Sequence, residues 1–78
     1  MVFLNKHAEK YIKIGKRIAF YRKLLGLTQE QLAIKIGVSY SYITKIEAPN
    51  TIQPFSLEIL FDISEALGID IRMLLDDI

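Results

Sequence analysis

Apolar residues recur along most of the chain at the spacing of helices. Between residues 9 and 25 they fall at i, i+4, i+7 and i+11, the pattern of an amphipathic helix. This stripe consists of Ile14, Ile18, Tyr21 and Leu25. Gly26 follows, a residue suited to the left-handed conformation that ends many helices. No segment shows sustained alternation of apolar and polar positions, so no strand is predicted.

Two shorter helices follow, each with a recognisable first residue. Thr28 with Gln31 three residues later forms a capping box, which predicts a helix over about 28–36. Its expected buried residues are Leu32, Ala33 and Ile36. Ser39 is the expected N-cap of a second helix over about 39–47. At 100° per residue this helix has two faces. Ile43 and Ile46 point one way, and the opposite arc carries Tyr40, Ser41, Thr44 and Lys45.

The remainder of the chain predicts a loop and two further helices. The segment "APNTIQP" contains two prolines and is expected to be a loop. A helix over about 56–67 should bury Leu57, Leu60, Ile63 and Leu67. Gly68 followed by an apolar residue predicts a Schellman ending, and Asp70 can cap a last short helix. We therefore expect an all-α fold of five helices, with residues 1–8 as a tail and residues 9–78 as a single domain.

The short connection "GVS" between the second and third helices carries the functional prediction. Three residues are too few for the helices to lie antiparallel, so they must meet at a steep angle, as in a helix-turn-helix. That geometry requires a small side chain where the helices nearly touch, which Ala33 supplies, and a turn residue tolerant of positive φ, which Gly37 supplies. The apolar wedge between the helices would consist of Leu32, Ile36, Val38, Ile43 and Ile46.

Charge is unevenly distributed although the net charge is only +1. Residues 1–46 contain nine basic and two acidic residues, a balance of +7, and residues 47–78 contain one basic and seven acidic residues, a balance of −6. The basic half can face a polyanion, or the two halves can simply attract each other. Charge alone does not choose between these interpretations.

Composition narrows the remaining classes of function. The chain has no cysteine and one histidine, so we expect no disulfide, metal site or cofactor. The absence of cysteine also suits a cytoplasmic protein, and the apolar runs are too short to span a membrane. No nucleophile–base arrangement or phosphate-binding loop is found, so we do not expect an enzyme.

The sequence resembles the lambda-repressor-like family, the Cro/cI or Xre type of helix-turn-helix transcriptional regulator. The resemblance is carried by "IGKRIAFYRKLLGLTQEQLAIKIGVSYSYITKIE" and "SLEILFDISEALGI". It implies a compact five-helix domain, usually dimeric on double-stranded DNA, with the helix over 39–47 in the major groove. Many relatives have a glycine two residues after the glutamate that ends this helix, whereas this chain reads "EAPN".

The resemblance also implies roles for particular residues. Base contacts are expected from Tyr40, Ser41, Thr44 and Lys45, and a phosphate contact from Gln29. Further phosphate contacts are expected from Tyr42, Asn50 and Thr51, on the basis of their positions in and after the helix and not of the resemblance. For Tyr42 we expect the ring to pack on the core with its hydroxyl near the DNA backbone. For Asn50 and Thr51 a simple turn is an equal alternative. Arg22 and Glu47 match a family ion pair that orients the recognition helix.

Two functions follow from this interpretation. The first is a transcriptional regulator, expected to be a repressor, that acts as a homodimer on a palindromic operator. The second is an antitoxin or protein-interaction module that binds a toxin or regulator, with DNA binding secondary. The apolar segments "VFL" and "IDIRMLLDDI" can serve either a partner or a dimer interface.

Overall fold

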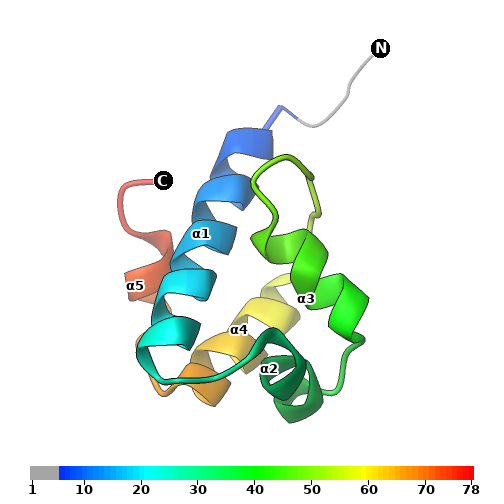
Figure 1. Cartoon of the computed structure of the whole chain (residues 1–78). Coiled ribbons are helices and arrows are strands. Elements are labelled where there is room, and N and C mark those ends of the chain that lie inside the picture. The colour runs from blue at the N-terminus through cyan, green and yellow to red at the C-terminus, as the bar shows by residue number, and fades with distance from the viewer. Residues whose placement is uncertain (1–5) are drawn as a thin grey trace.

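The computed structural model describes residues 6–78 and shows an all-helical domain (Figure 1). Within these residues there are five helices and no strand. The helices are α1 (Ala8–Leu24), α2 (Gln29–Ile36), α3 (Tyr40–Glu47), α4 (Leu57–Leu67) and α5 (Arg72–Leu75). The predicted fold class is therefore confirmed, with helix ends within one or two residues of those expected. Val2, Phe3 and Leu4, named above as part of a possible interface, lie outside the described residues.

The helices begin where side chains replace missing backbone hydrogen bonds. The N–H group of Gln31 donates to Thr28 Oγ1 at 3.0 Å, and the N–H group of Thr28 donates to Gln31 Oε1 at 2.8 Å. This confirms the capping box at the start of α2. Ser39 Oγ accepts the N–H group of Tyr42 at 3.1 Å and caps α3 in the predicted way.

The connection from α2 to α3 depends on Gly37. Its φ of 73° and ψ of 35° lie in the left-handed region, where a Cβ atom is unfavourable. The N–H group of the next residue, Val38, donates to the carbonyl oxygen of Ala33 at 3.0 Å and closes the end of α2. The chain can therefore change direction within three residues and start α3 at a steep angle to α2 (Figure 1).

The core lies where the helices meet. In Figure 1, α3 lies on one side of α1 and α5 on the other, while α4 crosses the lower part of the view and its connection to α5 passes behind the end of α1. Five side chains are almost completely buried there, and they come from all five helices: Ile18, Leu32, Ile43, Ile63 and Leu74. Because every helix contributes one of them, each depends on the others for its burial.

Two predicted core positions are wrong. Leu25 is 54% exposed and Leu57 is 59% exposed. Leu25 follows the last residue of α1, where the chain already turns away, and Arg22 is buried at that end of α1 instead. Leu57 is the first residue of α4, at the edge of the core. Ser64 is buried further along α4, where its hydroxyl donates to the carbonyl oxygen of Phe61 at 2.9 Å.

Helix α5 is attached to α1 by hydrogen bonds as well as by the burial of Leu74. Arg17 Nη1 donates to the carbonyl oxygen of Leu74 at 3.2 Å, and Lys13 Nζ donates to that of Asp77 at 2.7 Å. Cations at a helix C-terminus satisfy carbonyl groups that have no partner within the helix. The start of α5 also differs slightly from expectation, because Ile71 is its N-cap, although Asp70 Oδ1 still accepts the N–H group of Arg72.

Candidate nucleic-acid interface

Helix α3 has one buried face and one exposed polar face. Ile43 and Ile46 are 0% and 3% exposed and fasten the helix to the core. On the other side Tyr40, Ser41 and Lys45 are exposed. Thr44 is only partly exposed, and its hydroxyl donates to the carbonyl oxygen of Ser41 at 2.7 Å. The structure therefore brings the four expected base-reading residues onto one helix, with the Thr44 hydroxyl proton already engaged.

Tyr42 lies between these two faces. Its ring is half-buried and packs against the core. Burial raises the pKa of Tyr42 above its ordinary value of 10.0. The phenol, like that of an ordinary tyrosine, is neutral at physiological pH and keeps a hydroxyl proton that can be donated.

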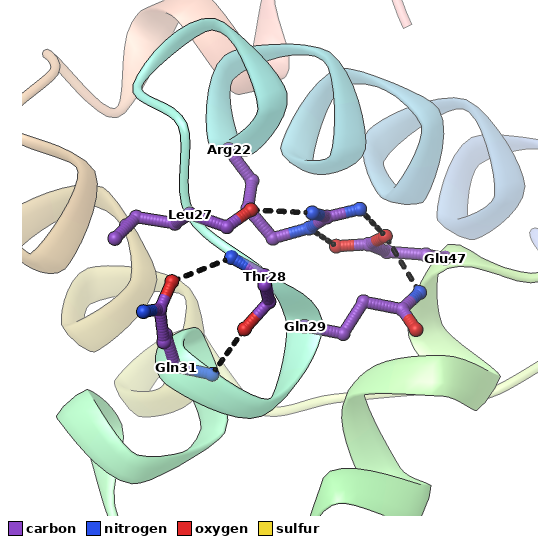
Figure 2. A network of polar contacts seen from close by, with 6 residues as sticks. All are labelled: Arg22, Leu27, Thr28, Gln29, Gln31 and Glu47. Carbon is purple, nitrogen blue, oxygen red and sulfur yellow. Dashed lines mark hydrogen bonds and ion pairs between the residues drawn. The ribbon is translucent and has the colours of Figure 1, made fainter.

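A buried ion pair lies on the inner side of α3, where it joins the end of this helix to α1 (Figure 2). Arg22 Nε donates to Glu47 Oε2 at 2.8 Å, and Arg22 Nη2 donates to Glu47 Oε1 at 2.8 Å. Arg22 Nη1 also donates to the carbonyl oxygen of Leu27 at 2.7 Å. One guanidinium group from α1 thereby holds both the end of α3 and the segment that leads into α2.

The pair is largely shielded from water. The side chains of Arg22 and Glu47 are 7% and 4% exposed. The hydrogen bonds to Glu47 raise the pKa of Arg22, the charge of Glu47 raises it further, and burial opposes both effects. Arg22 therefore stays cationic and neutralises a carboxylate that would otherwise repel an anion approaching α3.

Gln29 joins the pair from the first turn of α2. Its Nε2 donates to Glu47 Oε1 at 2.9 Å, which leaves the second proton of the amide unused by that bond. Figure 2 shows the amide reaching from α2 toward the carboxylate. Gln29 and Tyr40 also line an open hollow at the start of α2, together with Arg22, Leu27, Thr28 and Glu30. The first N–H groups of α2 have no acceptor within the helix and favour an anion at this position.

The two expected loop contacts are separate from this network. Asn50 and Thr51 are exposed and follow the C-terminal end of α3. In the same loop Gln53 Nε2 donates to the carbonyl oxygen of Pro54 at 3.0 Å, a local turn contact. These observations are compatible with either role considered for Asn50 and Thr51.

Sequence reasoning missed two features of the site. The Leu27 carbonyl oxygen accepts a bond from Arg22, and Glu30 brings a carboxylate to the hollow at the start of α2. The first depends on the angle at which α2 leaves α1, for which the sequence carries no signal. The second could have been anticipated, because Glu30 is next to Gln29. Among residues 6–78 no group of three or more potential metal ligands is found, and no helix is long and apolar enough to cross a membrane.

Comparison with known proteins agrees with this geometry. The sequence model of the helix-turn-helix family matches residues 18–74, which include α2, α3 and the network behind them. The chain belongs to the helix-turn-helix family. The resemblance to the lambda-repressor-like helix-turn-helix regulators is thereby confirmed.

Individual members of the family are similar over most of this chain. The transcriptional regulator SinR of Bacillus subtilis is 39% identical over 64 residues, which are 82% of this chain and 57% of SinR. The transcriptional regulator SlrR of the same organism is 40% identical over 81% of this chain and 41% of its own length. This chain thus spans about half the length of these curated relatives.

Solved structures show the same fold. The restriction-modification controller protein C.AhdI from Aeromonas hydrophila superposes with a TM-score of 0.77 at 32% identity, over 85% of this chain and 97% of C.AhdI. SinR in complex with DNA superposes with a TM-score of 0.73 at 40% identity, over 81% of this chain and 98% of that chain. SinR has also been solved in complex with the protein SinI.

Proposed function

We propose that this protein binds double-stranded DNA sequence-specifically and regulates transcription, acting as a repressor in the cytoplasm. The observation that carries the proposal is the exposed polar face of α3, with Tyr40, Ser41 and Lys45 outward while Ile43 and Ile46 fix the helix from behind. The structure of SinR in complex with DNA supports it by similarity. In this arrangement α3 enters the major groove, and Lys45 donates to guanine O6 and N7.

The network behind α3 supports the same proposal. Gln29 is held by Glu47 with one amide proton unused, at a helix N-terminus that favours an anion. We assign it a phosphate contact, which fixes the protein on the duplex without reading sequence. Tyr42, Asn50 and Thr51 are proposed as further phosphate contacts, and Thr44 as a base contact once its hydroxyl releases the Ser41 carbonyl group.

A homodimer on a palindromic operator completes the proposal. Two copies would place their recognition helices about 34 Å apart, one turn of duplex DNA. Selection of bound duplexes from a random pool tests this arrangement. We expect a palindromic motif with half-sites about one turn apart, bound more weakly as salt rises. Enrichment of a single half-site would overturn the dimer, and enrichment of no motif would overturn sequence-specific binding.

The second candidate is an antitoxin or protein-interaction module. It is supported by exposed apolar side chains on α4, on α5 and at the last residue, namely Leu57, Phe61, Met73 and Ile78, and by the complex of SinR with SinI. Purification of the tagged protein from its native cells distinguishes the two. A stoichiometric partner that remains bound and abolishes DNA binding favours the second candidate, whereas a homodimer that binds the selected duplex favours the first.

A further inference from the structure

Gly15 lies in the middle of α1, where a glycine weakens a helix relative to alanine. It is not among the glycines with positive φ, so backbone conformation does not explain its presence. It is buried, in the part of α1 that faces α3. The explanation must therefore come from what lies against it.

The neighbour of Gly15 is the backbone of α3. A Cβ atom at position 15 would overlap the carbonyl oxygen of Ile46 and would lie 3.1 Å from the carbonyl carbon of Ile46 and 3.6 Å from Glu47 Cα. All three are backbone atoms of the last turn of α3. A side chain could rotate away from such a contact, but a helix backbone can make room only if the whole helix moves.

We propose that Gly15 is a positioning residue for the recognition helix, because the missing side chain lets the last turn of α3 rest directly on the backbone of α1. The inference rests on the DNA-binding function proposed above. Arg22, which holds the Glu47 side chain, lies seven residues further along α1, about two helical turns away on the same face. Gly15 thus sets how deeply α3 is seated, and Arg22 fixes the side chain of its last residue.

The depth of this contact matters because base reading requires accurate geometry. Binding constellations work when held within about 0.5 Å of their productive positions. A methyl group at position 15 would displace α3 by more than about 0.5 Å, because its carbon would lie much closer to the carbonyl oxygen of Ile46 than a normal van der Waals contact allows. Contacts to bases at the far face of α3 would suffer most. Non-specific attraction to phosphates depends mainly on charge and would change little.

The test compares Gly15→Ala with Ile63→Val, a control that removes one methyl group from the core at α4 and leaves Gly15 and the last turn of α3 unaltered in sequence. Each variant is titrated with the duplex selected by the wild-type protein and with a scrambled duplex, at a temperature where circular dichroism shows all proteins folded. For Gly15→Ala we expect affinity for the selected duplex to fall about tenfold or more, and affinity for the scrambled duplex to change less than about twofold. For Ile63→Val we expect neither affinity to change.

The outcomes separate this inference from the function on which it rests. If the wild type is selective and Gly15→Ala keeps its selectivity, or if Ile63→Val loses selectivity equally, the positioning role of Gly15 is overturned. If the wild type itself does not discriminate between duplexes, the proposed function fails and this inference fails with it. Should Gly15→Ala be too unstable, the titrations are repeated at low temperature with an osmolyte that favours the folded state, and the same outcomes decide.

Discussion

At the scale of single residues, Glu47 shows how a negative charge can be tolerated on a helix that is proposed to approach DNA. Its two carboxylate oxygens accept three hydrogen bonds, two from Arg22 and one from Gln29. Two of the donors belong to a cation, so the pair is neutral overall. The carboxylate therefore serves as an anchor for α3, and its charge is neutralised inside the protein by Arg22.

Breaking this pair should be costly. The Glu47 side chain is 4% exposed in the intact protein. Replacement of Arg22 by alanine leaves this carboxylate with only Gln29 as a side-chain donor, and leaves the Leu27 carbonyl group without its partner. We expect Arg22→Ala to lower the free energy of unfolding by about 3–5 kcal/mol, as for other broken buried pairs. Urea denaturation followed by circular dichroism measures this change.

Removal of both charges provides the comparison. The double variant Arg22→Met, Glu47→Leu contains no unpaired buried charge and should recover much of the lost stability, although the Leu27 carbonyl group still lacks a donor. Lys23→Ala, an exposed neighbour on α1, should have little effect. If Arg22→Ala were no more destabilising than Lys23→Ala, the pair would not hold α3.

Lys45 and Gln29 should affect DNA binding in different ways. Lys45→Ala removes a proposed base contact and should relax the preference at one position of each half-site, at a cost of about 1–3 kcal/mol on the selected duplex. Gln29→Ala removes a proposed phosphate contact and should weaken all duplexes by similar factors. Titration of selected and single-base-changed duplexes measures both. An equal loss for both variants on every duplex would contradict these assignments.

At the scale of elements, helix ends were more predictable than helix faces. Thr28, Gln31 and Ser39 form local bonds that depend only on nearby residues, so the sequence determines them. Leu25 and Leu57 were misplaced because periodicity does not show where a helix leaves the core. The resemblance to a known family supplied the pairing of Arg22 with Glu47 and drew attention to Gln29 as a phosphate contact. It could not supply the Leu27 bond or the contact at Gly15, which depend on the distances between helices.

The turn between α2 and α3 offers a test at this scale. A Cβ atom at Gly37 would meet nothing within 4 Å, so any effect of substitution comes from the backbone conformation alone. We expect Gly37→Ala to lower the free energy of unfolding by about 1–2 kcal/mol, because its φ of 73° is unfavourable for alanine. Gly37→Asn should lose less, since asparagine tolerates this region better. Urea midpoints measure both, and equal stability of all three proteins would refute the argument.

At the scale of the whole molecule, the uneven charge serves two purposes. Arg22 is buried against Glu47, and Arg17 and Lys13 donate to backbone carbonyl groups at the end of α5. The basic half of the chain therefore holds the C-terminal segment and still presents other exposed lysines, including Lys35 and Lys45. The two interpretations of the charge pattern considered at the outset are compatible, and the charge available to a polyanion is smaller than the balance of +7 suggests.

The pH dependence of stability should report on the junction between α4 and α5. Hydrogen bonds from the side chain and backbone of Arg72 lower the pKa of Asp70 from 3.8 to about 2. A carboxyl group with a lowered pKa in the folded state stabilises the protein above its ordinary pKa, and this contribution is lost as pH falls through the folded value. The difference in unfolding free energy between wild type and Asp70→Asn should thus be largest near neutral pH and shrink between about pH 4 and pH 2.

Arg72→Met provides the matched background for this measurement. Without the guanidinium group the pKa of Asp70 should return toward its ordinary value, so that Asp70→Asn introduced into Arg72→Met should show a smaller change with pH between about pH 4 and pH 2. Thermal unfolding at several pH values measures all four proteins. The same pH-dependent difference in both backgrounds would mean that the guanidinium group of Arg72 is not the cause.

The three-donor arrangement around Glu47 also limits how this protein can diverge over evolutionary time. An acidic residue at position 29 would place a second anion beside Glu47, and an apolar residue at position 47 would strand the guanidinium of Arg22. Drift at any one of these three sites is therefore harmful unless the others change with it. We therefore expect substitutions at positions 22, 29 and 47 to occur together in related sequences. The exposed residues of α3, which are proposed to read bases, can vary independently of them.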